Sequence, residues 1–436
     1  MSVRIGYVIP EFPGQTHVFL WRERQALRAL GIQAELVSTR SPPPEIDSHG
    51  WSGEARRETS FLLPFSIGDF LKALAYLLRL DLAHWLLLVS TIRQAEARSP
   101  LERLRFIAMM LPAAKLARIA HRSRWAHLHV HSCGDAANLA VFCWAMCDLP
   151  YSLTLHGPTL ELYGGNQRQK WQHSRFATAV SQKLFEHVVY DLSLAPAEQV
   201  FVASMGVDLQ SLYRRRPYHV WSPGQPCRLF SCGRLNRIKG HDDLLRAVKS
   251  LRDAGIDVSL RIAGEDEQGG TGYHRVLDDL VLQAGLQDCV TLLGAVSEEQ
   301  IRDELEAAHV FVLASHNEGI SVAIMEAMAM EVPVVVTDVG GVRELVEHET
   351  DGLLVPDAQP EELAAMIRRV IENAELGAAM RCTSRAKIAQ RFTHHASAAA
   401  IAQAVRSAEA RASKTLTTSN SVEKSPEGAS AVAAQM

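Results

Sequence analysis

The sequence lacks the features that mark membrane-spanning, secreted or nucleic-acid-binding chains. No run of about 18 uncharged apolar residues occurs among the 436 residues, so a membrane-spanning helix is not expected. The N-terminus, MSVRIGYVIPEF, reads as a short strand and a turn and has no apolar signal-peptide core. A net charge of −4 gives no reason to expect a nucleic-acid partner. These absences predict a cytoplasmic protein.

Patterns typical of disulfides and metal sites are equally scarce. The seven cysteines are scattered without a CxxC, which favours reduced thiols. No Asp-x-Asp occurs to hold a metal-bound diphosphate. His129, His131 and Cys133 alternate on one strand face, but no second ligand pair stands out. The acidic run at 265–267 offers Mg²⁺ ligands, although a solvated loop is the preferred interpretation. We therefore expect no metal and no cofactor.

Short apolar segments alternate with helical stretches along most of the chain. This alternation predicts a parallel α/β architecture, and 436 residues are too many for one core. The expected strands fall into two series: 4–9, 34–38, 128–131, 152–155, 177–180 and 200–203, and then 228–232, 258–263, 290–293, 310–313, 334–337 and 353–355. Ligands in such sheets bind beyond the carboxyl ends of the strands, so the site is expected between the two domains.

The expected boundaries follow composition. Pro- and Arg-rich residues 213–226 form a linker between a first domain, 1–212, and a second domain, 227–392. Residues 393–411 are predicted to form a helix that packs back on the first domain. The remainder, 412–436, has few large apolar residues and is expected to be disordered.

One segment of the first domain stands apart. Residues 66–125 contain ten Lys or Arg against four Asp or Glu and are rich in Leu, Ala and Met. They predict an insertion of two or three helices with apolar and basic faces. Such helices suit an anionic membrane surface. They equally suit a packed helical hairpin with a solvated basic face, and the sequence does not decide between the two.

Two glutamates, Glu318 and Glu326, bracket the stretch EGISVAIME after an expected buried strand. Helical periodicity begins after Gly319, which places Glu318 in the loop that opens a helix and Glu326 about two turns further on. Free backbone N–H groups of Gly319, Ile320 and Ser321 would favour an anion there. A phosphate cradle flanked by hydroxyl-binding carboxylates suits a nucleotide sugar, whereas the plainer alternative is a capped surface helix.

Two cations open the second domain in FSCGRLNRIKGH. Arg234 and Lys239 follow the strand that ends near Cys232, at the mouth of the expected cleft. Fixed cations there would stabilise the negative charge that grows on a departing nucleoside diphosphate.

The chain resembles the retaining glycosyltransferases of family 4, which have the GT-B fold of two tandem Rossmann-like domains. The resemblance rests on GRLNRIKGH, EGISVAIMEAMAM and VPVVVTDVGGVRELVEHETDGLLVPDAQPEELA, and it extends to about residue 410. PEFPGQTHVFLWRERQALRALG, HLHVHSCGDAANLA, TLHGPTLELYG and FATAVSQ resemble the exopolysaccharide and lipopolysaccharide members of that family.

The resemblance implies a role for each of several positions. Donor-binding roles fall on Arg234 and Lys239 for the diphosphate, Glu326 for ribose, Glu318 for sugar hydroxyls, the backbone of Gly319, Ile320 and Ser321, and Gly294 to Val296 for the base. His156, in TLHG, would face the donor sugar as a catalytic residue with Glu318. The loop with Gly14, Gln15 and Thr16 would approach the phosphate and acceptor. His131, near its strand end, is expected to border the acceptor pocket.

The chain also departs from the family pattern. A glycine is usual where Glu331 stands, a proline is common at Ser321, and an acidic residue often follows the HG motif where Thr159 stands here. These departures bear on the acceptor and sugar rather than on the reaction class.

The sequence therefore predicts a metal-independent, retaining hexosyltransferase that uses a UDP- or GDP-sugar. The expected acceptor is a lipid-linked or growing surface polysaccharide, with possible binding to the inner face of the cytoplasmic membrane through 66–125. The competing interpretations are a sugar-nucleotide epimerase, which needs acid and base carboxylates in both domains, and a non-catalytic assembly protein, which would have lost a motif residue. An NAD-binding oxidoreductase needs a G-x-G-x-x-G turn that PEFPGQT does not supply.

Overall fold

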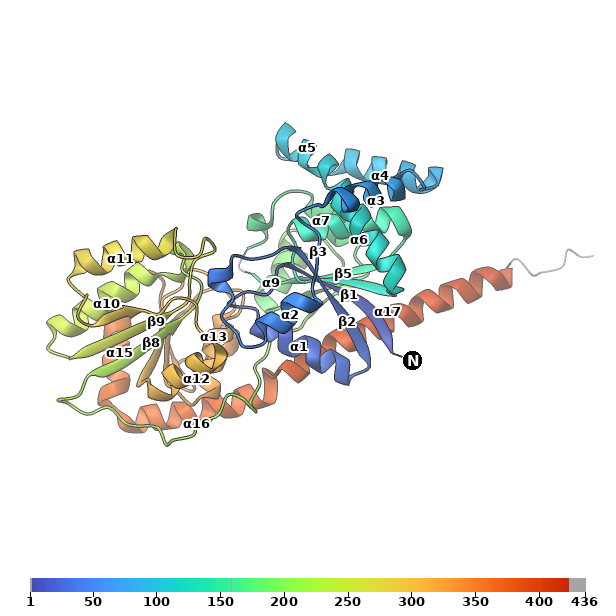
Figure 1. The fold of residues 1–436 in the computed structure, drawn as a ribbon. Helices are drawn as coiled ribbons and strands as arrows, with labels where there is room; N and C mark the ends of the chain where they lie inside the picture. Colours follow the sequence, from blue (N-terminus) through green and yellow to red (C-terminus); the bar gives the residue numbers. More distant parts are fainter. Residues whose placement is uncertain (1, 158, 423–436) are drawn as a thin grey trace, which may run out of the picture.

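The computed structural model describes residues 2–157 and 159–422, and two α/β domains face each other in it (Figure 1). The first domain has a seven-stranded parallel sheet in the order β3-β2-β1-β4-β5-β6-β7. Its strands are β1 Val3–Glu11, β2 Ile32–Arg40, β3 Ser60–Phe61, β4 His127–Val130, β5 Tyr151–Leu155, β6 Phe176–Ala179 and β7 Val200–Val202. The predicted series matches these strands, except that the two-residue β3 was missed.

The second domain has a six-stranded parallel sheet in the order β10-β9-β8-β11-β12-β13. Its strands are β8 Cys227–Cys232, β9 Val258–Ala263, β10 Val290–Leu292, β11 Val310–Leu313, β12 Val334–Thr337 and β13 Leu353–Val355. In both sheets the strand order reverses beside the first strand of the domain, which opens a ligand crevice beyond the carboxyl ends. The predicted GT-B architecture is confirmed.

Helices cover both faces of each sheet. In the first domain these are α1 Val18–Ala29, α2 Ser52–Glu58, α6 Met110–Ser123, α7 Asp135–Cys147, α8 Gln167–Gln172 and α9 Gln182–Glu186. In the second they are α10 His241–Asp253, α11 Tyr273–Ala284, α12 Glu298–Ala307, α13 Val322–Ala329, α14 Val342–Leu345, α15 Pro360–Glu372 and α16 Ala374–Arg391. Short single turns lie between them, η1 Pro44–Ile46, η2 Leu160–Tyr163, η3 His187–Asp191, η4 Ala197–Gln199 and η5 Arg237–Lys239.

The segment 66–125 forms four helices rather than two or three. Three of them, α3 Ile67–Leu77, α4 Leu82–Gln94 and α5 Pro100–Ala108, stand out from the domain (Figure 1). The fourth, α6, belongs to the domain itself, because most of its residues are buried and it packs on α7. The protruding insertion is therefore α3–α5.

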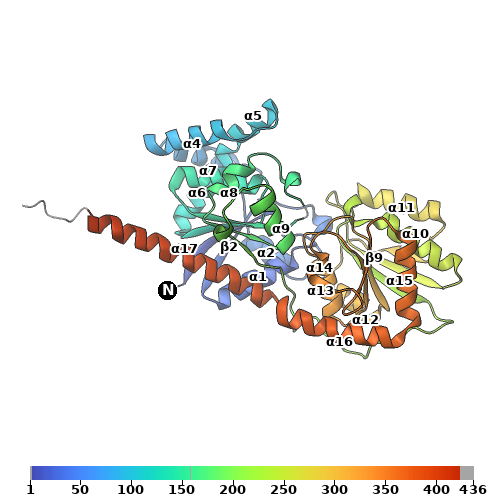
Figure 2. The same ribbon diagram turned by 180° about the vertical axis from the view of Figure 1, so that it is seen from behind.

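The chain returns to the first domain through its last helix. α17 His394–Val422 follows α16 and lies along α1, as the front and rear views both show (Figures 1 and 2). Buried Ala398, Ile401 and Val405 of α17 share a hydrophobic cluster with Leu20 and Leu27 of α1. The helix extends past residue 411, where it was expected to end. The expected disorder of 412–436 stays a prediction, and residues 423–436 lie outside the described part.

Candidate functional site

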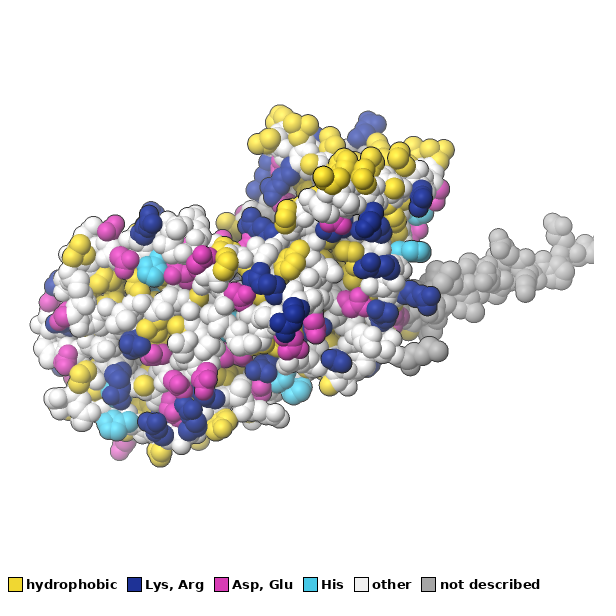
Figure 3. Space-filling model, viewed as in Figure 1, with side chains coloured by type: hydrophobic (Ala, Val, Ile, Leu, Met, Phe, Trp, Pro, Cys, Tyr) yellow, Lys and Arg dark blue, Asp and Glu magenta, His cyan; other side chains and the backbone are white. Residues whose placement is uncertain are grey.

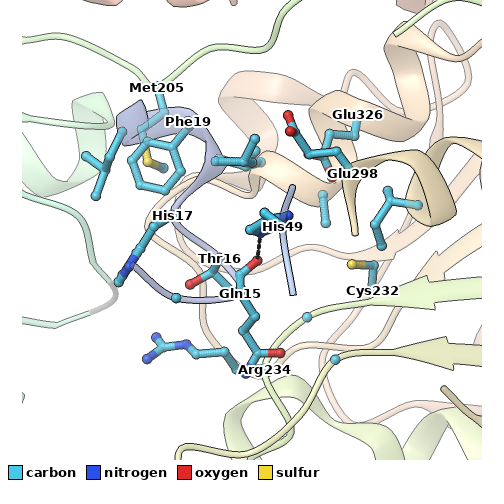
Figure 4. A pocket seen from close by; sticks show the side chains of 18 of the residues that line it. Gln15, Thr16, His17, Phe19, His49, Met205, Cys232, Arg234, Glu298 and Glu326 are labelled. Carbon is cyan, nitrogen blue, oxygen red and sulfur yellow. Dashed lines mark hydrogen bonds between the residues drawn. The ribbon is translucent and has the colours of Figure 1, made fainter. Parts of the chain in front are cut away.

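A cavity of about 1040 Å³ lies between the carboxyl ends of the two sheets. The first domain contributes the loop between β1 and α1 and the ends of β4 and β5, and the second domain contributes the loops after β8 and β11 and the start of α13 (Figure 4). Most residues predicted from sequence line this cavity, namely Gly14, Gln15, Thr16, His131, His156, Arg234, Lys239, Val296, Glu318, Ile320, Ser321 and Glu326.

The two predicted cations differ in their surroundings. Lys239, at the end of η5, donates to Glu318 with Nζ 2.6 Å from Oε1, and both side chains are largely buried. Ser315 also donates to the same carboxylate oxygen, at 2.7 Å. Arg234 is about half exposed and pairs with Glu267 at 2.7 Å. Lys239 is therefore held in one geometry by a carboxylate, whereas Arg234 lies in solvent at the rim and can reorient towards a ligand.

Helix α13 begins two residues later than the periodicity suggested. Ser321 is its N-cap, and its hydroxyl accepts from the backbone N–H of Ile324. Val322 and Ala323, the first helical residues, line the cavity. The free first-turn N–H groups thus belong to Val322 and Ala323 rather than to the predicted Gly319, Ile320 and Ser321, which precede the helix.

Gly319 marks the closest approach of the two domains. A Cβ atom at this position would lie 2.3 Å from the carbonyl oxygen of His156 and 3.0 Å from Cα of Gly157. Since real Cβ atoms do not approach backbone atoms so closely, only glycine allows the end of β5 to meet the loop before α13. This contact places the His156 carbonyl beside Gly319, the residue that follows Glu318.

The second motif glutamate, Glu326, has an unusual titration. Burial, and to a lesser extent the nearby Glu298, raise the pKa of Glu326 from 4.5 to about 8. Figure 4 shows both carboxylates at the same wall of the cavity. Glu298 is fixed by Arg22, at 3.2 Å, and by the indole N–H of Trp51, at 3.0 Å. Sequence reasoning missed Glu298, which has no motif around it.

The rings of His156 and His131 face each other in the first domain. His156 Nε2 lies 3.0 Å from His131 Nδ1, and His156 Nδ1 lies 3.2 Å from the sulfur of Met205. Burial lowers the pKa of His156 to about 4, so the ring is neutral near pH 7. Protein atoms therefore contact both ring nitrogens of His156.

His17 is a third cavity histidine that the sequence did not single out. Burial, with Arg234 as the next cause, lowers its pKa to about 3. The first-domain wall is therefore built of neutral imidazoles, which suit hydroxyl groups better than phosphate.

Gln15 joins the domains instead of reaching freely into the cavity. Its amide accepts from the backbone N–H of Glu265 at 2.7 Å and donates to the Glu265 carbonyl. Ser48 donates to the Val296 carbonyl at 2.9 Å in the same region. The Gly294 carbonyl is also engaged, because it accepts from Gly264 at 2.8 Å, and Gly294 does not line the cavity. Of the two predicted base-binding positions, only Val296 borders the cavity.

The possible metal ligands serve structural roles. His129 hydrogen-bonds to Ser152 at 2.7 Å and to Thr154 at 3.0 Å. Asp266 accepts backbone N–H groups of the loop before α11, while Glu265 pairs with His274 at 2.7 Å. Within the described residues no cluster of three or more His, Cys, Asp or Glu side chains suits a metal ion.

Comparison with known proteins addresses the identity of this site. Residues 222–387 match the sequence model of the family "Glycosyl transferases group 1". The chain is 31% identical over 221 residues to the amylovoran biosynthesis glycosyltransferase AmsK of Erwinia amylovora, covering 49% of this chain and 52% of that protein. It is 35% identical over 175 residues to the putative colanic acid biosynthesis glycosyltransferase WcaL of Escherichia coli, covering 39% and 41%. The chain thus spans about half the length of the curated relatives it matches.

Solved structures share the whole fold. Anabaena Alr3699/HepE, in complex with UDP and glucose, aligns with a TM-score of 0.70 at 18% identity over 93% of this chain and 100% of that one. Sucrose-phosphate synthase from Thermosynechococcus elongatus aligns with a TM-score of 0.72 at 18% identity over 94% and 100%. These likenesses show that the chain has the GT-B fold, and residues 222–387 are similar in sequence to the glycosyl transferases group 1 family.

Proposed function

We propose that this protein transfers a hexose from a UDP- or GDP-sugar to a lipid-linked or polysaccharide acceptor, with retention of configuration. The observation that carries the proposal is the single cavity into which Lys239, Glu318 and Glu326 converge from one domain and His156 from the other. Relatives named for amylovoran and colanic acid biosynthesis support an exopolysaccharide product, and a structural neighbour that holds UDP and glucose supports the donor class.

Each residue contributes a separate part of the reaction. Lys239 and Arg234 would hold the diphosphate and stabilise the charge that it gains on leaving. Glu326 would accept from the ribose hydroxyls, and Glu318 from hydroxyls of the donor sugar. The His156 carbonyl would lie beside the anomeric carbon and favour its developing positive charge.

The transfer step itself needs no protein nucleophile in this scheme. The bond between the anomeric carbon and the leaving phosphate oxygen breaks, while the acceptor oxygen bonds to the same face of that carbon. The acceptor hydroxyl proton passes to the leaving phosphate oxygen. With two cations available for the diphosphate, we propose that turnover does not require a metal ion.

The experiment combines nucleotide binding with turnover. UDP, GDP, ADP and CMP are compared for thermal stabilisation of the protein, and matching sugar nucleotides are then assayed for hydrolysis or transfer by mass spectrometry, with and without EDTA. We expect UDP or GDP to raise Tm and the matching sugar to be turned over with EDTA present. Lys239→Met should lose both effects, whereas Lys249→Met, on the outer face of α10, should keep them.

Three results would contradict the proposal. Interconversion of the free sugar nucleotide without release of nucleoside diphosphate would identify an epimerase. Binding of a nucleotide without any turnover by wild-type protein, on a panel including lipid-linked acceptors, would favour a non-catalytic assembly role. Turnover that stops with EDTA and returns with Mg²⁺ would refute metal independence.

The insertion α3–α5 supports a location on a membrane surface. Eleven of the 21 exposed large hydrophobic residues in the described part of the chain lie on these helices or, for Leu78, on the turn between α3 and α4. They are Ile67, Phe70, Leu71, Leu74, Leu78, Leu82, Leu86, Val89, Leu101, Leu104 and Ile107. Figure 3 shows the apolar side chains gathered along the outer edge of the insertion. We name this surface the apolar ridge; a contiguous patch of this kind is rare on a protein that stays in water.

The exposed faces separate the two interpretations that the sequence left open. A packed hairpin would bury its leucines and expose its basic face, whereas here Leu78 and Leu82 are each 73% exposed. Lys72, Arg79 and Arg93 are exposed on the same helices and suit anionic headgroups. We therefore propose that the apolar ridge docks on an anionic bilayer at the inner face of the cytoplasmic membrane.

The helices are arranged for lying on a membrane. Within the described residues no single helix is long and apolar enough to cross a bilayer, and α3 and α4, which meet that test only as a pair, are bent by 110°. The ridge is also connected to the cavity, because Glu102 of α5 accepts from Gly165 at 3.2 Å and Arg98 donates to the Gly164 carbonyl. Tyr163 of that same loop lines the cavity, so docking would bring a lipid-linked acceptor to its mouth.

Vesicle flotation tests the docking surface. Vesicles of phosphatidylcholine with 30% phosphatidylglycerol should retain wild-type protein, and neutral vesicles should retain less. Leu78→Ser with Leu82→Ser should weaken retention at least ~10-fold, since each buried leucine contributes about 1.5–3 kcal/mol.

The matched control is Val276→Ser with Leu282→Ser, two exposed apolar residues of α11, and it should bind as wild type does. Equal retention of all variants would refute the proposal. Self-association that depends on Leu78 and Leu82, without vesicle binding, would instead identify a second copy of the chain as the partner.

A further inference from the structure

A chain of buried polar groups continues behind His156 into the first domain. His156 contacts His131 of the β4 end, and His131 Nε2 lies 3.5 Å from Oε1 of Glu23 on α1. Glu23 and His131 are 4% and 5% exposed. The sequence motifs drew attention to the two histidines but assigned no role to Glu23.

Two hydroxyl groups hold the Glu23 carboxylate from opposite elements. Tyr7 of β1 donates to Oε1 at 2.5 Å, and Ser397 of α17 donates to Oε2. Burial raises the pKa of Glu23, and both hydroxyl donors oppose this rise. The last helix of the chain therefore supplies one partner of a carboxylate that lies directly behind the cavity residue His131.

The arrangement leaves few choices for the protons on the two rings. Burial lowers the pKa of both histidines, so each ring is neutral and carries one N–H. His131 Nε2 faces a carboxylate oxygen that already accepts from Tyr7, and this favours an N–H at that position. His131 Nδ1 then accepts from His156 Nε2–H, and His156 Nδ1 carries no proton; in this arrangement the carboxylate of Glu23 outweighs the weak acceptor sulfur of Met205, 3.2 Å from His156 Nδ1.

We propose that Glu23 and His131 are positioning residues that set the tautomer and orientation of His156, and that Ser397 makes this setting depend on the docking of α17. The ring in turn holds the end of β5, where the His156 carbonyl and Gly157 meet Gly319. The C-terminal helix thus acts on the cavity through the Ser397–Glu23 hydrogen bond, the 3.5 Å contact between Glu23 and His131, and the His131–His156 hydrogen bond, rather than through residues that line it.

The neighbours of Glu23 and His131 determine which other groups could change protonation state. Tyr7, His131 and Ser397 contact Glu23 from three different elements. His17, His129 and His156 are the titratable groups that face His131. Burial holds the pKa of His17, His129 and His156 below the normal value of 6.5. Glu23 is therefore the group whose protonation switches the tautomers of the His131 and His156 rings.

Nitrogen-15 NMR of histidine-labelled full-length protein reads the tautomer directly. At pH 8 wild-type His156 should carry its proton on Nε2. In Glu23→Gln the amide oxygen can occupy only one of the two carboxylate positions. With that oxygen accepting from Ser397, the N–H₂ group takes the Oε1 position, donates to the Tyr7 hydroxyl oxygen and faces His131, and His156 should switch to the Nδ1–H tautomer. Assignment uses His156→Asn and His131→Asn.

A milder variant keeps the test independent of folding. Ser397→Ala removes one donor from the carboxylate, so the pH at which the two rings change tautomer should rise relative to wild type. Ser407→Ala, an exposed serine of the same helix, should leave that pH unchanged. An unchanged His156 tautomer in Glu23→Gln, or equal effects of the two serine variants, would overturn the proposal.

The catalytic consequence rests on the proposed sugar transfer, whereas the NMR signal does not. With an active donor in hand, Glu23→Gln should lower kcat at least tenfold and leave KM within about twofold, because Glu23 touches no part of the donor site. A changed tautomer without any turnover in the wild type would refute the sugar transfer alone. An unchanged kcat with a changed tautomer would refute the functional role of the relay.

Discussion

Replacing Glu326 by glutamine should stabilise the protein at alkaline pH. The pKa of this carboxyl is raised from 4.5 to about 8, chiefly by burial. Below pH 4.5 the folded and unfolded chains both hold the proton, so an isosteric amide changes little. Between about pH 4.5 and 8 the unfolded chain loses the proton first, so wild-type stability falls as pH rises. Above pH 8 the difference in the free energy of unfolding between wild type and Glu326→Gln stays at its full value.

The magnitude follows from the shift. Each pKa unit corresponds to about 1.4 kcal/mol, so the stabilisation of Glu326→Gln relative to wild type has an upper limit of about 5 kcal/mol. Partial contact of the carboxyl with the solvent in the cavity reduces the expected stabilisation to about 2 kcal/mol. Thermal unfolding followed by circular dichroism at pH 5 and pH 9 measures it. We expect equal Tm values at pH 5 and a Tm several degrees higher for Glu326→Gln at pH 9.

The exposed Glu375 of α16 provides the matched control, since Glu375→Gln should show no such pH dependence. A Glu326→Gln variant that is less stable than wild type at pH 9, or whose Tm difference is the same at both pH values, would refute the reasoning. Above pH 8, where the wild-type carboxylate is ionised, the same variant should also bind nucleoside diphosphate more weakly, because a neutral amide is a poorer acceptor for ribose hydroxyls.

Three further outcomes follow from single positions. Gly319→Ala places a Cβ 2.3 Å from the His156 carbonyl oxygen, so the cavity should be forced open. Turnover should then fall at least ~10-fold, with Tm nearly unchanged. Gly377→Ala is the control, because a Cβ at Gly377 meets no atom closer than 3.9 Å. Glu331 adopts φ +54°, where glycine is unstrained. Glu331→Gly should therefore raise the free energy of unfolding, measured by urea titration, by about 0.5–1 kcal/mol, whereas Glu331→Ala should not. Lys170 is buried, and burial lowers its pKa to about 7. The stability of the wild type relative to Lys170→Met should therefore rise between pH 7 and 10. A constant difference between the urea midpoints of the two proteins over that pH range would contradict this.

The fold was largely predictable because its signals are local. Apolar runs such as 310–313 and 334–337 are fully buried in the second sheet, and strands buried on both faces read as continuous hydrophobic segments. The two residues of β3 carry no such pattern, and they were missed. The start of α13 was misplaced because apolar periodicity marks the buried face, whereas the N-cap depends on which side chain accepts the first backbone N–H.

The site was only partly predictable, because its motif residues act through partners distant in sequence. No role was assigned to Glu298, which has no motif around it, or to Glu23, which lies within the segment 10–31 that carries part of the resemblance. Both reach the cavity or its histidines only through the tertiary fold. Glu331 shows the opposite case. The family glycine that it replaces corresponds to a left-handed backbone position, so the departure noted in sequence is a local strain in the structure rather than a change in the site.

The pairing of Lys239 with Glu318 connects the two halves of donor recognition. Sequence motifs assign the lysine to phosphate and the glutamate to sugar, as if each acted alone. In the structure their atoms are 2.6 Å apart, and Ser315 donates to the same carboxylate oxygen. A diphosphate that accepts from Lys239 competes with Glu318 for that ammonium group and shares its charge. The carboxylate, still held by Ser315, then has greater capacity to accept from sugar hydroxyls. Phosphate binding would in this way prepare the sugar subsite, which gives a physical reason for the proximity of the two motifs at the cavity floor.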